Sequence, residues 1–346
     1  MRVIVYPPTV DWHWMKQRPQ QLMSGLARCG YTVYFCNKTR SGERTKRIGD
    51  DLFLVSDHER WLREEWPSIR ARCRSAGVWC TLPHQAASLA AYEPDWIVYD
   101  CADEFAEWIA YEAEIAAIAD LFVCTAEPIC RRLRRTYPHK RIELIRNGYD
   151  PAMGLHEPES GSGGAETIPE DLPADKPIIG YVGAWAPWVD AELVGELSLL
   201  AAKAEAEVVV IGPEYGRRYS NGRPSRIRFL GLKPHEQLAR YIRRLSVCLI
   251  PFRPTPVTLA TNPVKAYEYL ASGRPVVSSD MPECRRMQPH IDIAAGRRQF
   301  IELALHRLRQ PGDAAARRQY ALGNTWAHRA QQAAAALQSI EKGCER

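Results

Sequence analysis

The sequence predicts an α/β fold in which two Rossmann-like parallel-sheet domains face a cleft. Short apolar runs alternate with helical stretches along almost all of the 346 residues, which is typical of parallel strands joined by crossover helices. One segment rich in Gly, Ser, Pro and acidic residues, 154–176, interrupts the alternation. The pattern then restarts with a new strand, so we expect two domains, in keeping with a length that is long for one.

The first domain, 1–153, is expected to consist of seven strands with helices between them. Each strand run is short and almost continuously apolar, because strands of a parallel sheet are buried on both faces. The predicted strands are Val3–Tyr6, Thr32–Cys36, Leu52–Val55, Gly77–Thr81, Trp96–Tyr99, Leu121–Cys124 and Ile142–Ile145. The predicted helices are Gln17–Cys29, Glu59–Ser75, Phe105–Ala119 and Pro128–Thr136.

The segment 154–176 has no hydrophobic periodicity, and we interpret it as a linker or mobile loop. The second domain, 177–324, follows the same pattern as the first. Its predicted strands are Ile178–Val182, Glu207–Ile211, Ile227–Leu230, Val247–Pro251 and a run that begins at Val276. Its predicted helices are Ala191–Lys203, Pro234–Leu245, Arg297–Arg309 and Ala314–Leu322, and a last helix, Trp326–Glu341, ends the chain.

Composition and charge indicate a globular protein of the cytoplasm. The net charge of +5 is too small to imply a general attraction to nucleic acid. No signal peptide precedes the first strand, and no apolar run approaches the roughly 20 residues of a membrane span. None of the ten cysteines forms a C-x-x-C pair, and Cys36, Cys124 and Cys248 lie in strand-like runs. We therefore expect buried thiols in a reducing compartment.

The most informative stretch is 261–280, which predicts a loop, a helix and a buried strand. Asn262 is a good N-cap, Pro263 suits the first helical position, and Gly273 ends the helix. The helix would start at the carboxyl end of the strand Val247–Pro251. Helix N-termini in that position bind anions through their free N–H groups.

Two charged residues in this helix point to the same chemistry. Lys265 lies in the first turn, where the helix dipole slightly disfavours a cation, and a bound phosphate would explain its presence. Glu268 follows three residues later, on the same face. The alternative is an exposed ion pair between them, a nearly neutral feature.

This stretch resembles the donor-nucleotide segment of GT-B glycosyltransferases, especially glycosyltransferase family 4. In that family a glutamate before an ending of the type Leu-Ala-Ser-Gly-Arg-Pro-Val-Val binds the ribose of a sugar nucleotide, and here it would be Glu268. Further resemblances follow in chain order at 14–33, 97–103, 119–126 with 145–150, and 180–190. The resemblance implies a GT-B architecture whose C-terminal helix, about 325–346, crosses back to the first domain.

The resemblance also implies which residues bind the substrates. Those expected at the nucleotide-sugar donor are Gly183, Trp185, Arg253, Thr261, Asn262, Pro263, Val264, Lys265 and Glu268. Those expected on the acceptor side are His13, Arg18, Asp100 and Asp103. Asp103 and Lys265 would be catalytic, the first by deprotonating an acceptor hydroxyl and the second by stabilising the leaving diphosphate.

Several interpretations stay open at this stage. The family places a second glutamate eight positions before Glu268, and here that position is Ala260. Trp185 and Trp188 either stack on a sugar or pack a domain interface. Asp103 is either a base or the N-cap of the helix that follows it. His13 is either an acceptor ligand or an ordinary loop histidine.

The motifs together predict a metal-independent enzyme without a cofactor. No G-x-G-x-x-G opens either domain, no P-loop motif occurs, and no D-x-D follows a strand. We expect transfer of a sugar from a nucleotide diphosphate sugar to a hydroxyl of a cell-surface glycan or lipid-linked precursor, with retention of configuration. The alternatives are a sugar-nucleotide epimerase of the same fold and a non-catalytic nucleotide-sugar-binding partner protein.

A basic run in the first domain suggests a second interaction. Arg131–Arg141 contains six basic residues and a histidine in eleven positions. Such a cluster is attracted to anionic lipid, so it is a candidate for peripheral contact with the inner face of the cell membrane. The alternative is a solvated helix face.

Overall fold

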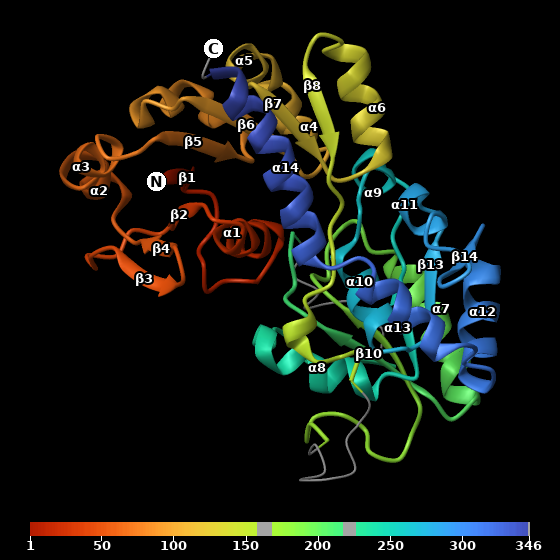
Figure 1. Cartoon of the computed structure of the whole chain (residues 1–346). Coiled ribbons are helices and arrows are strands. Elements are labelled where there is room, and N and C mark those ends of the chain that lie inside the picture. The colour runs from red at the N-terminus through yellow and green to blue at the C-terminus, as the bar shows by residue number, and fades with distance from the viewer. Residues whose placement is uncertain (158–167, 217–225, 345–346) are drawn as a thin grey trace. The chain divides into compact units, whose positions relative to one another are not determined.

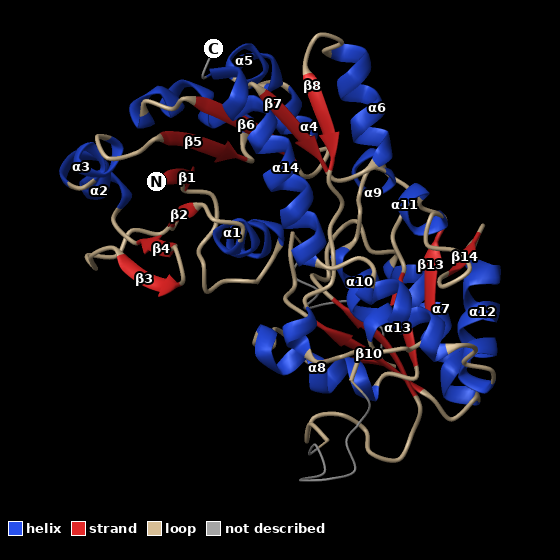
Figure 2. Ribbon diagram, viewed as in Figure 1, coloured by secondary structure: helices blue, strands red, loops and turns tan. Residues whose placement is uncertain are grey.

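The computed structural model describes residues 1–157, 168–216 and 226–344. The chain forms two compact units (Figure 1). Unit 1 comprises Met1–Asn147 and Trp326–Arg346, and unit 2 comprises Gly148–Thr325. Each unit has its own sheet, with strands lying among helices (Figure 2).

Unit 1 is built on an eight-stranded sheet in the order β3-β4-β2-β1-β5-β6-β7-β8. Every neighbouring pair is parallel except β3 and β4, which are antiparallel at the edge. The strands are β1 (Arg2–Tyr6), β2 (Thr32–Cys36), β3 (Lys46–Gly49), β4 (Leu52–Val55), β5 (Ser75–Cys80), β6 (Trp96–Cys101), β7 (Leu121–Cys124) and β8 (Arg141–Leu144).

The C-terminal helix belongs to unit 1, as predicted, and packs against the first helix. A Cβ on Gly25 would lie 2.5 Å from the Cβ of Ala330, so the close approach requires a glycine. The helices are α1 (Arg18–Arg28), α2 (His58–Glu64), α3 (Trp66–Arg70), α4 (Ala106–Ile109), α5 (Glu112–Ile118), α6 (Glu127–Thr136) and α14 (Trp326–Cys344), with a 3₁₀ segment η1 (Pro83–Tyr92).

Unit 2 is built on a six-stranded, wholly parallel sheet in the order β11-β10-β9-β12-β13-β14. The strands are β9 (Ile178–Val182), β10 (Glu207–Ile211), β11 (Ile227–Phe229), β12 (Val247–Ile250), β13 (Val276–Ser279) and β14 (Asp292–Ala294). The helices are α7 (Ala191–Lys203), α8 (His235–Arg244), α9 (Pro256–Leu259), α10 (Val264–Ala271), α11 (Pro282–Arg285), α12 (Arg297–Arg309) and α13 (Ala314–Leu322), with a 3₁₀ turn η2 (Pro151–Met153).

The strand order of unit 2 creates a topological switch point between β9 and β12. The chain leaves β9 for β10 on one side and later returns to the other side as β12. The loops that follow β9 and β12 therefore diverge, and ligands of open α/β sheets bind in the crevice that such loops leave. The corresponding switch point of unit 1 lies between β1 and β5.

Two predicted helices of unit 1 are each divided in the structure. The predicted helix Glu59–Ser75 is α2 and α3, and its last residue already opens β5. The break falls at Glu65, before Trp66-Pro67, because a proline cannot donate a helical hydrogen bond and favours the first turn of a new helix. Phe105–Ala119 is likewise divided into α4 and α5.

The predicted linker, 154–176, is part of unit 2. Its residues 158–167 lie outside the described part of the chain. On either side of that gap, Leu155 and Leu172 are buried in the core of unit 2. Asp171 accepts hydrogen bonds from Lys233 Nζ at 2.6 Å and from the Tyr241 hydroxyl at 3.0 Å. The described ends are therefore anchored to the sheet and its helices, which the absence of periodicity did not indicate.

Two further features concern the whole described chain. No helix within the described ranges is both long and apolar enough to cross a membrane. The described cysteines are free thiols, and Cys36, Cys124 and Cys248 are buried, as predicted.

Candidate functional site

The loop after β9 and the first turn of α10 meet at the switch point of unit 2. A Cβ on Gly183 would lie 2.3 Å from the Nζ atom of Lys265. Gly183 also has a φ of +138°, a backbone conformation that residues other than glycine rarely adopt. Glycine is thus required at this position for two reasons, and it leaves room for the ammonium group.

Hydrogen bonds to both neighbouring loops fix the loop after β9. The Gly183 N–H donates to the carbonyl of Ile211 at 2.8 Å, and the Trp185 N–H donates to that of Pro213 at 2.9 Å. On the other side, the Arg253 N–H donates to the carbonyl of Trp188 at 2.8 Å. These hydrogen bonds hold the loop in place next to the N-terminus of α10.

The ammonium of Lys265 lies against aromatic rings. Its Nζ atom is 4.0 Å from the ring centroid of Tyr181 and 5.0 Å from that of Phe252. Burial lowers the pKa of Lys265 to about 7, against the opposing effect of the Glu268 carboxylate. A lysine with this pKa carries its charge only in part near neutral pH. An anion placed beside it would restore the full charge.

The N-cap of α10 is Pro263, so the prediction that Asn262 caps this helix was wrong. Pro263 has an extended conformation, with φ −75° and ψ 119°, and the helix begins at Val264. The Asn262 side chain, only 2% exposed, instead exchanges hydrogen bonds with the Tyr267 hydroxyl and donates to Glu283 Oε2. The first N–H groups of α10 have no intrahelical acceptor, as in any α-helix.

Trp185 does not have either of the roles considered for it. Its ring is 0% exposed and packs edge-on against Tyr181 and Phe229, at centroid distances of 6.1 Å and 5.3 Å. It belongs to the core of unit 2, so it neither stacks on a sugar nor packs a domain interface. Trp188 is partly exposed, and its ring lies 5.8 Å from that of the exposed Tyr215.

The remaining predicted donor residues have local partners. The Thr261 hydroxyl donates to the Val257 carbonyl at 2.7 Å. The Arg253 guanidinium lies 4.0 Å from Asp190 at the start of α7. Glu268 is partly exposed on α10, one turn after Lys265.

Arg18 and Asp100 in unit 1 form a buried ion pair. Arg18 is 5% exposed and Asp100 2% exposed, and they share three hydrogen bonds of 2.9–3.1 Å. The Trp79 indole donates to Asp100 at 3.0 Å, and Arg18 also donates to the carbonyl of Ile145 at 2.9 Å. The prediction that these residues bind an acceptor was wrong, because both charges are enclosed and occupied with each other. The pair instead fastens α1 to β6.

Asp103 follows β6 and differs sharply from Asp100. It does not cap the next helix, because the N-cap of α4 is Phe105 and no side chain caps it. Burial raises the pKa of Asp103 to about 6, the nearby Arg18 lowers it, and the charge of Asp100 raises it further. A carboxylate whose pKa lies close to the working pH is suited to act as a general base.

His13 lies in the loop between β1 and α1 and is exposed. The loop is held by Asp11, which accepts hydrogen bonds from the backbone N–H and the hydroxyl of Thr39 at 2.7 Å and 2.6 Å. This loop leaves the sheet at the switch point between β1 and β5. His13 is therefore available to a ligand, but no neighbour among the described residues marks it as a catalytic group.

The basic run of unit 1 is only partly available to a partner. Arg132 donates to both oxygens of Glu112, at 2.6 Å and 2.7 Å, and forms an ion pair with Glu104, which precedes α4. Lys140 donates to the Ala119 carbonyl at 2.8 Å, and Arg141 pairs with Glu143. The arginines of α6 that remain exposed are Arg131, Arg134 and Arg135. Sequence reasoning missed the role of Arg132, which ties α6 to the loop that carries Asp103.

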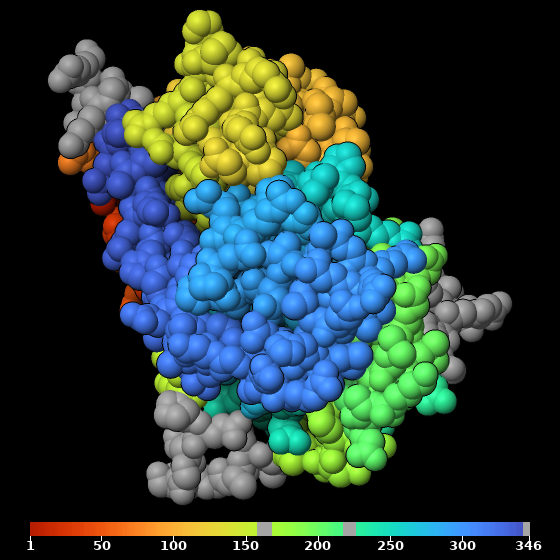
Figure 3. All heavy atoms as spheres, turned by 90° about the vertical axis from the view of Figure 1, so that its right-hand side faces the viewer, coloured from red at the N-terminus to blue at the C-terminus, as the bar shows by residue number. Residues whose placement is uncertain are grey.

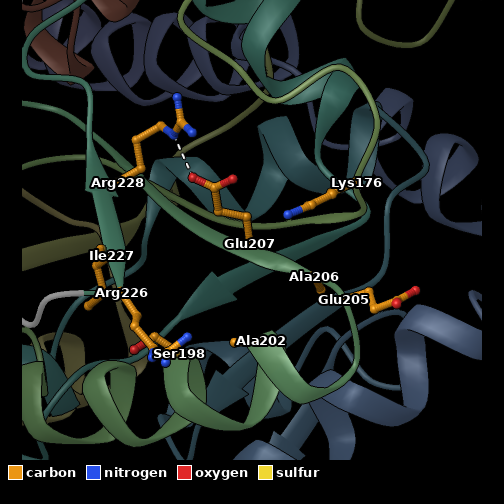
Figure 4. A pocket seen from close by; sticks show the side chains of 9 residues that line it. All are labelled: Lys176, Ser198, Ala202, Glu205, Ala206, Glu207, Arg226, Ile227 and Arg228. Carbon is orange, nitrogen blue, oxygen red and sulfur yellow. Dashed lines mark hydrogen bonds and ion pairs between the residues drawn. The ribbon is translucent and has the colours of Figure 1, made fainter.

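A cavity of about 390 Å³ lies elsewhere in unit 2 (Figure 4). Lys176, Glu207 and Ile227 place it at the amino ends of β9, β10 and β11. Its charged side chains are of both signs, and Arg228 donates to Glu207 across it. Since ligands of parallel sheets bind at the carboxyl ends of the strands, we do not assign this cavity to the candidate site.

Comparison with known proteins finds a family model that is similar to the part of the chain with the candidate donor residues. A family model described as glycosyl transferases group 1 matches residues 176–300. The matched residues all lie in unit 2. The matched range extends from the residues before β9 into α12 and includes Gly183, Lys265 and Glu268.

A curated relative is the putative teichuronic acid biosynthesis glycosyltransferase TuaH of Bacillus subtilis. It is 22% identical over 253 residues, which cover 66% of this chain and 61% of the relative. The chain thus spans about three fifths of the length of that relative.

Solved structures show the fold. Sucrose-phosphate synthase from Thermosynechococcus elongatus is similar with a TM-score of 0.72 and 15% identity, over 99% of both chains. Trehalose-phosphate synthase from Burkholderia vietnamiensis has a TM-score of 0.69 and 14% identity, over 98% of this chain and 97% of that chain. HepE from Anabaena, in complex with UDP and glucose, has a TM-score of 0.67 and 12% identity, over 98% and 100%. The predicted GT-B fold is confirmed.

Proposed function

We propose that this protein is a glycosyltransferase that moves a sugar from a nucleotide diphosphate sugar to an acceptor hydroxyl. One observation carries the proposal. The ammonium of Lys265, with a pKa of about 7, lies over Gly183 at the N-terminus of α10 and at the switch point of the glycosyltransferase domain. The structure of HepE with UDP and glucose supports a nucleotide-sugar donor.

The donor would bind by its diphosphate and its ribose. The first N–H groups of α10 would donate to the diphosphate oxygens, and Lys265 would take up a proton beside them. As the bond to the sugar breaks, negative charge grows on the leaving diphosphate, and a fixed cation stabilises that charge most in the transition state. Glu268 would accept hydrogen bonds from the ribose hydroxyls, as the family resemblance implies.

The acceptor would bind to unit 1, with Asp103 as its base or anchor. The raised pKa of Asp103 supports this role. The carboxylate lies in a partly buried loop and does not cap α4, so capping does not explain its presence. The family resemblance favours retention of the donor's anomeric configuration. Proton NMR of the first product formed, before mutarotation, distinguishes retention from inversion.

We infer further that the acceptor is a cell-surface glycan or a lipid-linked precursor, in keeping with the name of the relative TuaH. Arg131, Arg134 and Arg135 on α6 are exposed and could hold a cytoplasmic enzyme at anionic lipid. Co-sedimentation with vesicles of phosphatidylglycerol at low and high salt tests this contact. Replacing all three by serine should abolish binding, and unchanged binding would contradict the contact.

We also propose that the reaction needs no metal ion, because Lys265 and the N-terminus of α10 together supply positive charge to the diphosphate. Excess EDTA should leave the rate of the purified enzyme unchanged. Loss of activity in EDTA with recovery in Mg²⁺ or Mn²⁺ would contradict a metal-free reaction.

The decisive experiment is an acceptor-dependence assay. A thermal-shift panel of nucleotide sugars first selects the donor, because a ligand at 100 times its Kd adds about 2.7 kcal/mol to the stability of the native state. Release of nucleoside diphosphate is then measured with and without candidate acceptors. A transferase releases it rapidly only with the acceptor, an epimerase changes the sugar without needing one, and a binding protein does neither.

A further inference from the structure

We propose that the carboxyl edge of the unit 1 sheet binds sugar rings of the acceptor, and that Trp14 and Tyr111 are the aromatic surfaces on which these rings stack. The acceptor would then be a molecule that already carries carbohydrate. This assignment rests on the proposed function, because it concerns the acceptor of that reaction. Trp14 is 57% exposed and Tyr111 is 45% exposed. Large apolar side chains that are exposed together often mark a binding site.

The exposed tryptophan and tyrosine side chains follow the carboxyl ends of strands. Among the described residues they are Trp14, Tyr111 and Tyr215. The first follows β1, the second lies between α4 and α5 after β6, and the third follows β10. The exposed aliphatic side chains Leu199 and Leu200 instead lie on α7, whose surface is green in Figure 3. Ligands of parallel sheets bind at the carboxyl edge, so the exposed aromatic rings lie where a ligand is expected.

Hydrogen bonds hold the loop between β1 and α1, which carries Trp14, in one conformation. The side chain of Gln20 on α1 is 0% exposed and donates to the carbonyls of Asp11 and Met15, both at 3.2 Å. The backbone N–H of Trp14 also donates to the Asp11 carbonyl at 3.2 Å. The backbone is thus fixed on both sides of Trp14. A residue on a fixed backbone loses little conformational freedom when a ligand binds to it.

Contacts between neighbouring loops join this loop to the segments that follow β5 and β6. The Gln85 side chain in η1 donates to the Pro8 carbonyl at 2.7 Å, which connects η1 to the loop after β1. The adjacent His84 packs edge-on against Tyr111, with ring centroids 5.9 Å apart. β1, β5 and β6 are neighbouring parallel strands, so their carboxyl ends share one edge of the sheet. The two exposed aromatic side chains therefore belong to connected loops of that edge.

Asp103, the proposed base, belongs to the same edge. It lies in the chain between the end of β6 and Tyr111. Arg18, the first residue of α1, pairs with Asp100 at the end of β6, and its charge also acts on Asp103. Trp14 is four positions before Arg18, and a chain of that length spans at most about 14 Å. One oligosaccharide can therefore extend from Trp14 to a reacting hydroxyl at Asp103.

Carbohydrate has the chemistry that this edge fits. A pyranose ring has an apolar face of C–H groups that packs on an aromatic ring, and its hydroxyls bond to polar side chains around that ring. The exposed polar residues His13, Gln17 and Glu107 lie close to the two aromatic residues in the sequence. The carboxylate of Glu107 would oppose contact with anionic lipid, so a membrane surface fits this edge less well than a glycan.

The test is saturation-transfer difference NMR of the full chain with short oligosaccharides as probes. The panel contains gluco-, galacto- and manno-configured chains, with and without N-acetyl and carboxyl groups. The wild type should transfer saturation to the ring C–H protons of one configuration. Trp14→Ala should weaken its affinity about tenfold or more, because truncating an aromatic anchor is among the costliest changes at an interface, and Tyr111→Ala should weaken it as well. Trp14→Phe should retain most of the affinity, because an aromatic face remains.

The matched control is Ile118→Ala. Ile118 is 42% exposed at the end of α5, which precedes β7, so it lies at the amino edge of the same sheet. Its replacement should leave the affinity for the oligosaccharide unchanged. Because Trp14 and Tyr111 are exposed as well, all three alanine variants should keep the melting temperature of the wild type.

Absence of saturation transfer from the wild type to every oligosaccharide would overturn the proposal, as would an affinity that neither Trp14→Ala nor Tyr111→Ala changes. Binding to phosphatidylcholine vesicles that Trp14→Ala abolishes, with the oligosaccharide affinity unchanged, would assign the edge to lipid instead. The proposed function is decided separately, by nucleoside diphosphate release from the wild type. Donor affinity should be the same in all variants, because the proposed donor residues are in unit 2.

Discussion

Arg18 in unit 1 is buried and Lys265 in unit 2 is partly buried, but the surroundings of the two cations differ. Arg18 shares three hydrogen bonds with the buried carboxylate of Asp100. Lys265 has aromatic rings beside its ammonium, and its pKa falls to about 7. A charge whose partner is built into the protein holds the fold together. We propose that Lys265, which has no carboxylate bonded to its ammonium among the described residues, is paired instead by an anion that arrives with a ligand.

Asp100 and Asp103 repeat the comparison within one loop. Asp100 is occupied by Arg18 and by the Trp79 indole. Asp103, three residues later, has a raised pKa and no capping role. We propose that the same distinction separates structural groups from catalytic and ligand-binding groups in both units, and three substitutions test this proposal.

Breaking the structural pair should have the largest effect. Asp100→Asn leaves the buried Arg18 without its counter-charge, and such a loss costs about 3–5 kcal/mol of folding free energy. Urea denaturation of the full chain measures it. Nucleotide affinity of the folded variant should be unchanged, because the proposed donor residues are in unit 2. A loss of stability below about 1 kcal/mol would show that the pair does not hold the fold.

Asp103→Asn should give the reverse result, a catalytic loss without a loss of stability. Removing a general base lowers the rate about a hundredfold or more. The folded pKa is raised above that of a free carboxyl, so the ionised form is disfavoured by folding at neutral pH, and asparagine should keep or raise the melting temperature. The wild-type rate should fall as pH drops below about 6. Full activity of the variant would remove Asp103 from the mechanism.

Glu268→Ala should have the smallest effect of the three. Losing a charge-assisted hydrogen bond to the ribose weakens nucleotide binding about ten- to hundredfold. Glu268 also raises the pKa of Lys265, so its removal should lower that pKa further. Calorimetry with the selected nucleotide sugar measures the affinity, and repeating it in buffers of different ionisation enthalpy measures the proton uptake that depends on the pKa of Lys265. The control is Glu302→Ala on α12, which also removes one carboxylate. An affinity equal to that of the wild type would contradict the ribose contact.

The sheet strands and most of the longer helices could be predicted from the sequence, because their apolar runs and periodicity are local signals. β9, β10 and α7 were predicted to the residue. Two edge strands were not predicted: β3, because the sequence Lys46–Gly49 is polar and exposed, and β14, because it has only three residues. Short helices such as α9 and α11 also escaped prediction, because they have no apolar periodicity of their own.

The roles of site residues were harder to predict where they depended on contacts between residues distant in sequence. Arg18 and Asp100 are 82 positions apart, and no local pattern reveals that they neutralise each other. The strand-and-loop position of Trp185 does not tell which way its ring points. Lys265 could be singled out because a cation in the first turn of a helix conflicts with the helix dipole, and that conflict is visible in the sequence.

The central claim is that Lys265 takes up a proton, and so becomes fully charged, when the donor binds. We would titrate the selected nucleotide sugar into the enzyme in buffers of different ionisation enthalpy, at pH 8 and at pH 6. With a pKa of about 7, free Lys265 is mostly neutral at pH 8 and mostly charged at pH 6. Donor binding should therefore take up nearly one proton at pH 8 and almost none at pH 6. Lys265→Met should abolish the uptake at pH 8, whereas an uptake that persists in this variant, or no uptake in the wild type, would contradict the account.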